Sequence, residues 1–118
     1  MSHRIERINN LIRQEISDLL QHEVKDPRLN SLLAVTQVDT SADLKHARVY
    51  VSCISSEEER QTIIKALTAA SGFFHRELTR SLRMRSIPEL SFHWDDSMER
   101  ADHITRLIDQ VSSEHEAE

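Results

Sequence analysis

The chain has 118 residues and a mass of 13.7 kDa, the size of one domain, and about a quarter of it is Leu, Ile, Val or Phe, which favours a folded core. No apolar run exceeds four residues, so we expect no membrane span, and the first residues hold no apolar signal core, so we expect no secretion. Cys53 is the one cysteine, which excludes an intrachain disulfide. Together these features favour a cytoplasmic protein. The net charge of −5 argues weakly against nucleic-acid binding. The charge is unevenly distributed, however: residues 60–87 carry six basic groups and one acidic group, whereas residues 88–118 carry two basic and nine acidic groups.

An amphipathic helix is predicted over residues 4–24. Its apolar residues recur at three- and four-residue steps and would form one stripe. They are Ile5, Ile8, Ile12, Ile16, Leu19 and Leu20. Asp26-Pro27 is expected to stop the helix, because proline restricts the residue before it.

Two strands follow, over residues 32–39 and 46–54. The second alternates apolar and polar residues, which is typical of a strand with one buried face. The first is less regular, because Val35 and Val38 would lie on opposite faces of a straight strand, so we expect a bend or burial on both sides. The short polar link between the strands favours an antiparallel hairpin.

A pair of helices is predicted next. Ser56 with Glu59 fits a capping box at the start of the first helix. Gly72, the one glycine of the chain, interrupts the helical pattern, and glycine inside a helix costs roughly 1 kcal/mol relative to alanine. We therefore expect a kink or tight turn at Ala70-Ser71-Gly72, with a second helix from 73 to about 85.

The last part of the chain predicts a third strand and a final helix. Residues 90–94 alternate apolar and polar side chains after Pro88. Asp96 with Glu99 can cap a helix whose apolar stripe is Ile104, Leu107, Ile108 and Val111. We expect a single domain over 1–111 and a disordered acidic tail over 112–118.

The candidate binding surface is the helix from 73 to about 85. A helical wheel puts Phe74, Leu78 and Leu82 on one side and Arg76, Arg80 and Arg83 on the other, with Arg85 in the exit turn. Guanidinium groups make forked contacts with phosphate, so the stripe suits sequence-independent binding to a nucleic-acid backbone. A solvated polar face without a binding role is the simpler explanation. Such faces, however, normally carry both positive and negative charges, and here Glu77 is the one acidic residue among four arginines.

Other chemistry finds little support in the sequence. The seven histidines are scattered without the spacing of metal ligands, and a chain with one glycine cannot build a glycine-rich phosphate loop. Asp95 and Asp96 would point to opposite faces of a strand, and Cys53 is expected to be an inert core thiol. We therefore predict no catalytic residues, no metal and no cofactor.

Several motifs in this order resemble those of the bacterial ribosome-binding factor A family. They are residues 4–20 with 24–28, residues 35–52, Ala70-Ser71-Gly72, and residues 85–92 followed by Asp95. The resemblance as a whole runs from about Arg4 to Val111, nearly the whole chain. Any one motif would be weak evidence, but their common order and spacing are specific.

The resemblance implies an α+β fold of the KH-like (type II) kind, a three-stranded sheet with helices packed on one face. Ordinary KH domains grip the backbone with a Gly-X-X-Gly loop, and this chain, like the family, has Ala70-Ser71-Gly72 instead. The resemblance also implies binding of free 30S small ribosomal subunits and 16S rRNA, and help in late maturation including 5′-end processing of 16S rRNA, without catalysis. We expect a monomer.

The family motif covers Ala70 to Gly72, and Arg76, Arg80, Arg83 and Arg85 are added from the helical wheel and the exit turn. A protein-interaction adaptor remains the alternative, in which the basic stripe meets an acidic protein and the KH-like fold is a scaffold. A steep loss of RNA affinity with salt would favour the first hypothesis. A nuclease would need a metal or acid/base set that the sequence does not offer.

Overall fold

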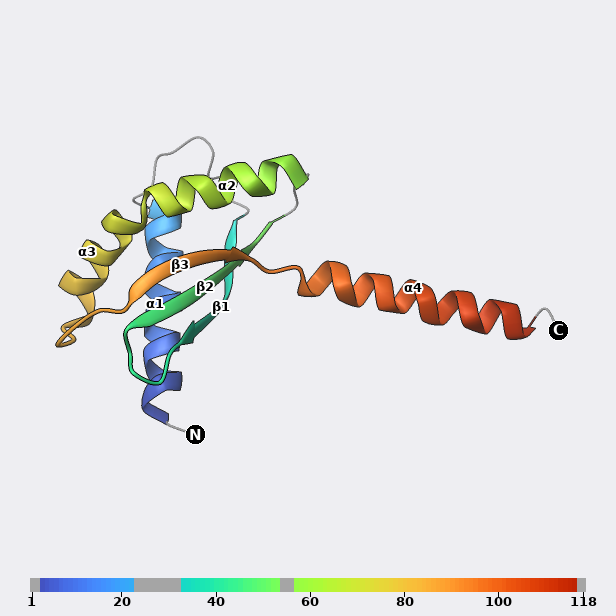
Figure 1. Cartoon of the computed structure of the whole chain (residues 1–118), viewed down its shortest axis with the longest axis horizontal. Helices are drawn as coiled ribbons and strands as arrows, with labels where there is room; N and C mark the ends of the chain where they lie inside the picture. The colour runs from blue at the N-terminus through green and yellow to red at the C-terminus, as the bar shows by residue number, and fades with distance from the viewer. Residues whose placement is uncertain (1–2, 23–32, 54–56, 117–118) are drawn as a thin grey trace.

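The structure is a computed structural model that describes residues 3–22, 33–53 and 57–116. Its elements are α1 (His3–His22), β1 (Ala34–Thr40), β2 (His46–Ser52), α2 (Glu57–Ala69), α3 (Ser71–Leu82), β3 (Glu89–Trp94) and α4 (Ser97–Glu116) (Figure 1). The α+β class and the order of the elements are thus confirmed. The predicted helix stop at Asp26-Pro27 and the predicted cap at Ser56 lie outside the described residues.

The three strands form one mixed sheet in the order β1-β2-β3. β1 and β2 are the expected antiparallel hairpin, and β2 pairs with β3 in parallel. A parallel pair cannot be joined by a tight turn and needs a crossover connection, which α2 and α3 supply here. In register, Val49 of the central strand lies between Val38 and Phe92, so one face of the sheet is continuously apolar.

A β-bulge explains the irregular pattern of the first strand. The register of β1 against β2 shifts between Val35 and Gln37, so that Thr36 is an extra residue in the ladder. Because a bulge adds one residue to one strand, it restores Val35 and Val38 to the same face. Both valines are buried on that one face, so of the two expected explanations the bend is the one that the structure has.

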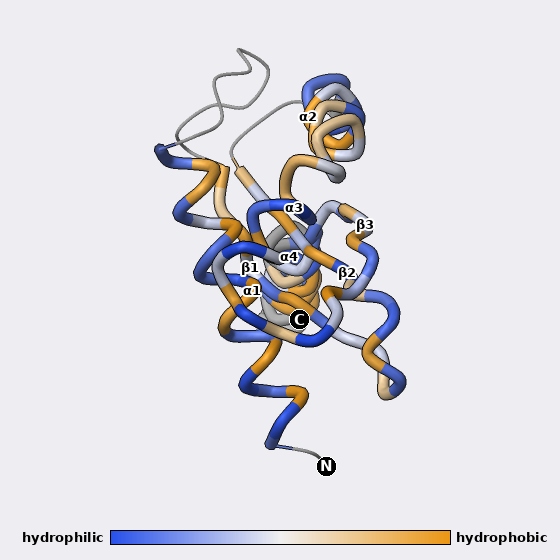
Figure 2. The backbone as a smooth tube through the Cα atoms, turned by 90° about the vertical axis from the view of Figure 1, so that its left-hand side faces the viewer, coloured by the Kyte–Doolittle hydropathy of each residue, from blue (hydrophilic) through white to orange (hydrophobic). Residues whose placement is uncertain are grey.

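Helices cover the apolar face of the sheet, with α1 against β1, and with α2 and α3 against β3. The tube of α1 alternates between hydrophilic and hydrophobic along its length, as an amphipathic helix should (Figure 2). The largest fully buried side chains come from these three helices, from β2 and from the link before β3. They are Phe74, Ile12, Ile16, Leu67, Leu78, Val49, Val51 and Pro88. The other face of the sheet carries Tyr50 and His93, whose ring centres are 5.5 Å apart.

The kink between α2 and α3 involves a single residue. Ala70 has φ −91° and ψ 4°, outside the helical range, and its N–H is shared between the carbonyls of Ala66 and Leu67, each at 3.1 Å. The Phe74 N–H donates to the Ala70 carbonyl at 3.1 Å, so hydrogen bonding resumes at once. Gly72 is the second residue of α3 and has no left-handed φ, so the chain bends before it.

The final helix differs from the others in its surroundings. Figure 1 shows α4 projecting away from the sheet. Its apolar stripe is about half exposed, with Ile104 at 56% and Ile108 at 60% of full accessibility. The helix runs to Glu116, five residues past the boundary expected at 111, so this stretch of the expected disordered tail is helical.

Candidate nucleic-acid interface

The apolar side of α3 is firmly held. Phe74 and Leu78 are completely buried, and the ring of Phe74 packs against that of Phe92 with centres 5.5 Å apart. His75 Nε2 lies 3.2 Å from the carbonyl oxygen of Ile87, the residue that leads into β3. Because α3 is anchored along this whole side, its opposite side must face solvent.

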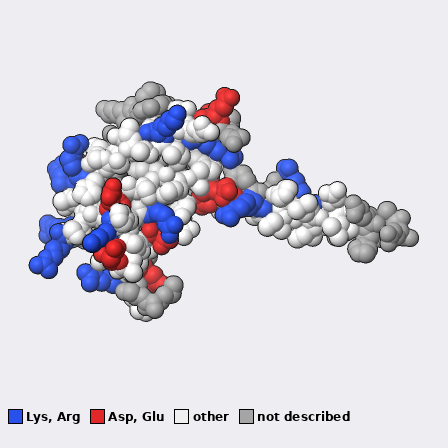
Figure 3. Space-filling model, in the orientation of Figure 1, with Lys and Arg blue, Asp and Glu red and all other residues white. Residues whose placement is uncertain are grey.

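The basic side of α3 points outward, as the helical wheel predicts. Arg76 and Arg80 are exposed, and Figure 3 shows Lys and Arg side chains gathered at the left edge of the molecule, where Figure 1 places α3. Arg83 is exposed too, but it is not helical. It is the C-cap residue, with φ 49° and ψ 33°, because the chain turns into the left-handed region after Leu82. The helix was expected to end near residue 85 and ends three residues earlier, at Leu82. The helical row of arginines is therefore shorter than expected and consists of Arg76 and Arg80.

One acidic side chain lies within the stripe. The Arg80 guanidinium is 3.3 Å from Glu77 Oε1, in a pair whose arginine side chain is 77% exposed. An exposed pair of this kind contributes at most about 1 kcal/mol, so a phosphate can replace the glutamate at little cost. Within the described residues, no ion pair holds Arg76 or Arg83.

The kink lies at the start of this basic surface. Ala70 and Ser71 are half-buried, and Gly72 is exposed. Arg76 follows Gly72 by one helical turn and therefore lies on the same side of α3. The structure thus brings the kink together with Arg76 and Arg80.

Arg85 belongs to a different part of the surface. It lines a cleft of about 410 Å³ together with Arg4 and Arg7 of α1, between the β1–β2 hairpin and the link from α3 to β3. The sequence places Arg4 and Arg7 only outside the apolar stripe of their helix. Their spacing of three residues was a weak signal, because nothing local predicts that the hairpin and the exit turn lie beside them.

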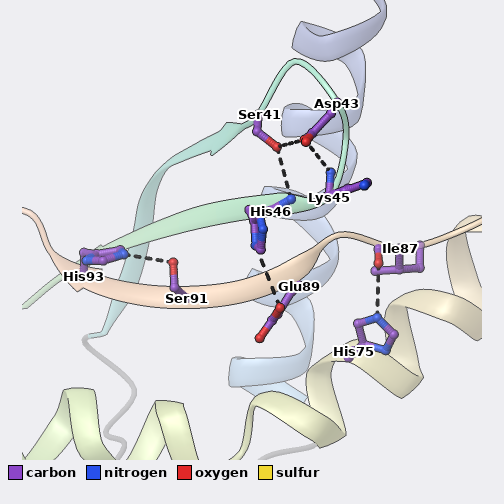
Figure 4. A network of polar contacts seen from close by, with 9 residues as sticks. All are labelled: Ser41, Asp43, Lys45, His46, His75, Ile87, Glu89, Ser91 and His93. Carbon is purple, nitrogen blue, oxygen red and sulfur yellow. Dashed lines mark hydrogen bonds and ion pairs between the residues drawn. The ribbon is translucent and has the colours of Figure 1, made fainter.

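The hairpin beside this cleft is held by a compact hydrogen-bond network (Figure 4). The Ser41 hydroxyl donates to Asp43 Oδ1 at 2.6 Å, and the Lys45 N–H donates to the same oxygen at 3.1 Å. These hydrogen bonds lower the pKa of Asp43 below its usual value, the serine contributing most. Leu44, between them, has φ 62°, a left-handed conformation that costs a non-glycine residue about 1–3 kcal/mol.

Carboxylates near the end of β3 have structural partners. Asp95 Oδ1 accepts a hydrogen bond from the Ser97 N–H at 2.9 Å, and its Oδ2 accepts one from the Thr36 hydroxyl at 2.5 Å. The sequence assigns the helix cap to Asp96, whose carboxylate instead pairs with Arg100 at 2.9 Å. No group of acidic, histidine or cysteine side chains in the described part of the chain could hold a metal ion. No helix within that part is long and apolar enough to cross a membrane.

The fold and its surface define a small α+β domain that holds a basic helix on the crossover of a three-stranded sheet. The chain belongs to the ribosome-binding factor A family, whose sequence model matches residues 4–108. It is 46% identical to ribosome-binding factor A of Acetivibrio thermocellus over 112 residues, 95% of this chain and 91% of the relative. It is also 46% identical to that of Dehalococcoides mccartyi over 118 residues, 100% of this chain and 99% of the relative.

Solved structures agree with the family assignment. The crystal structure of ribosome-binding factor A from Thermus thermophilus superimposes with a TM-score of 0.67 at 30% identity, covering 76% of this chain and 93% of the other. A homology model of the Thermus thermophilus factor, fitted into the cryo-electron-microscopy map of a 30S complex with that factor, superimposes with a TM-score of 0.60 at 30% identity. This match covers 82% of this chain and 97% of the other. The similarity therefore includes the fold as well as the sequence.

Proposed function

We propose that this protein binds free 30S ribosomal subunits through 16S rRNA and assists their late maturation, including 5′-end processing of 16S rRNA. It acts in the cytoplasm as a monomer, without catalysis and without a cofactor. The fitted 30S complex of the Thermus thermophilus relative supports the choice of partner. The contact surface consists of the kink at Ala70, Ser71 and Gly72 and the arginines Arg76, Arg80 and Arg83. Arg85 is a further proposed rRNA contact, on the neighbouring cleft.

The observation that carries this proposal is the two-sided character of α3. Its apolar residues Phe74 and Leu78 are completely buried, so the helix cannot rotate to hide its arginines. Arg76 and Arg80 consequently project from a rigid support into solvent. Forked guanidinium groups on such a support suit rRNA phosphates, which give affinity without needing to read the bases.

Gly72 gives independent support for a contact at the kink. A Cβ added at Gly72 would meet no heavy atom within 4 Å, and its φ is not left-handed. Neither packing nor backbone conformation therefore requires glycine in the free protein. A residue without a side chain also lets another backbone approach closely, and a phosphate backbone lying against α3 would use that space.

The decisive experiment is co-sedimentation with separated 30S subunits, 50S subunits and joined ribosomes at low and moderate salt. The test variant is Arg76→Glu with Arg80→Glu, and the matched control is Arg100→Glu with Arg106→Glu on α4, which changes the net charge equally. We expect selective recovery with free 30S subunits. We expect at least a tenfold loss of affinity for the α3 variant and little change for the control.

Each alternative outcome has a definite meaning. Equal losses in both variants would show that net charge alone matters and would overturn the α3 interface. Recovery of the wild-type protein with no ribosomal particle would overturn the proposed function and favour an adaptor whose basic stripe meets an acidic protein. For the non-catalytic role, precursor 16S rRNA incubated with the pure protein should keep its length, and shortening would contradict that part.

A further inference from the structure

We propose that the cleft lined by Arg4, Arg7 and Arg85 binds one unpaired nucleotide of single-stranded RNA. This inference rests on the proposed function, because it names a second RNA contact of the same protein. The cleft lies between the first turns of α1, the β1–β2 hairpin and the link between α3 and β3. We call it the three-arginine cleft.

The floor of the three-arginine cleft is apolar. It is lined by Ile8, Leu11, Leu44 and Met84, and its volume of about 410 Å³ falls in the range of small-ligand sites. Leu11 is 41% exposed although α1 buries other apolar residues well. An exposed leucine in the lining of a concave site offers a surface on which a flat base can rest.

The charged side chains of the cleft are predominantly basic. Within the described residues, no ion pair or hydrogen bond engages the side chains of Arg4, Arg7 or Arg85. The one acidic residue in the lining is Asp43, whose carboxylate already accepts hydrogen bonds from Ser41 and Lys45. Three guanidinium groups against one carboxylate leave the lining with a net positive charge, which favours an anion, and phosphate suits their forked geometry.

The walls of the cleft are fixed before any ligand arrives. The two non-glycine residues with positive φ in the described part of the chain are Leu44 and Arg83. Leu44 lines the cleft directly, and Arg83 ends α3 so that Met84 and Arg85 turn towards α1. Strained backbone at both walls is the pattern expected where a rigid shape serves binding, since preformed sites lose less entropy when the ligand binds.

Single-stranded RNA fits this combination better than other anions. An unpaired base can leave the stack, rest on apolar side chains and stack against guanidinium planes while its phosphates meet the rim. A duplex presents phosphates but keeps its bases stacked inside, so it would leave the floor unused. An acidic peptide would contact the arginines but leave the apolar residues of the cleft unused, so it is a suitable competing ligand.

The test is a two-dimensional NMR titration of the full chain with a five-nucleotide single-stranded oligoadenylate. A duplex RNA of five base pairs and a pentaglutamate peptide are titrated in parallel. The rim variant is Arg4→Ala with Arg7→Ala and Arg85→Ala. The matched control removes three arginines elsewhere: Arg13→Ala with Arg48→Ala and Arg100→Ala. The floor variant is Leu11→Gln, at an exposed position that should not affect folding.

We expect saturable shifts of the Leu11, Leu44 and Met84 signals with the single strand. The rim variant should weaken binding at least tenfold, and the control much less. The floor variant should weaken single-strand binding severalfold and leave duplex binding unchanged. Chemical-shift changes confined to α3, equal effects of the rim variant and the control, or a stronger response to pentaglutamate would each overturn the inference. If the rim variant is unfolded, the chemical-shift changes of the wild-type protein still show whether the oligonucleotide occupies the cleft.

Co-sedimentation with 30S subunits separates this inference from the proposed function. If the protein binds 30S subunits but the oligonucleotide leaves the three-arginine cleft unperturbed, the cleft assignment fails alone. If the oligonucleotide occupies the cleft but no ribosomal particle is bound, the proposed function fails and the cleft stands as an RNA site.

Discussion

The helices α3 and α4 have similar sequence patterns and opposite environments. Both carry an apolar stripe on one side and charged residues on the other. In α3 the apolar residues Phe74 and Leu78 are completely buried, whereas in α4 even Leu107 is 47% exposed. Periodicity therefore predicts that a helix has two sides, but it does not predict whether another element covers the apolar side.

The contrast suggests that α3 contributes strongly to stability while α4 contributes little. Substitutions in the two helices can test this directly. Chemical denaturation gives the free energy of unfolding of each variant.

The largest effect is expected for Phe74→Ala. The ring packs against Phe92 in the core, and truncating a buried phenylalanine typically costs about 3–5 kcal/mol. Because the ring anchors α3, its loss should also weaken the proposed RNA binding. A cost below 1 kcal/mol would contradict the description of α3 as an anchored helix.

A smaller effect of opposite sign is expected for Gly72→Ala. Alanine finds free space there and reduces the entropy of the unfolded chain, so we expect a gain of about 0.4–1 kcal/mol. Binding to 30S subunits should nevertheless weaken if a phosphate backbone lies against the kink. Stabilisation with unchanged 30S affinity would remove Gly72 from the interface.

Asp95 tests how firmly α4 is attached at its start. Hydrogen bonds lower the pKa of Asp95, with the larger contribution from Ser97 and a smaller one from Thr36. The ionised form of Asp95 therefore stabilises the folded state. This contribution is present above the unfolded pKa of about 4 and disappears as the pH falls through the lowered folded value. Asp95→Asn should therefore be a few tenths of a kcal/mol less stable at pH 7 and equally stable in strong acid. A constant difference across that range would contradict the assignment.

The smallest effect is expected in α4 itself. Replacing Leu107 and Ile108 together by glutamine should change stability by no more than about 0.5 kcal/mol, because both side chains are already about half exposed. The matched core variant is Leu78→Ala in α3, which should cost about 2–5 kcal/mol. A large loss in the α4 variant would show that its stripe is covered in solution.

Local patterns predicted the elements and the outward direction of Arg76 and Arg80, because helix and strand periods depend on neighbouring residues. They missed the end of α3, since Arg83 adopts a left-handed conformation that usually marks glycine or asparagine. They also missed the association of Arg4, Arg7 and Arg85. These residues meet only because the hairpin, α1 and the exit turn pack together, and such long-range proximity leaves no local trace in the sequence.

The parallel pairing of β2 with β3 has a consequence for folding. The hairpin can form from neighbouring residues, but β3 must wait until the whole of residues 53–88 has closed a loop, which is slow because non-local contacts follow a large entropy loss. The segment that closes this loop contains the kink and α3. A chain that has formed only its hairpin therefore has no assembled arginine surface. We expect the proposed affinity for RNA to appear in the last kinetic phase of refolding, so that partly folded chains do not bind through α3.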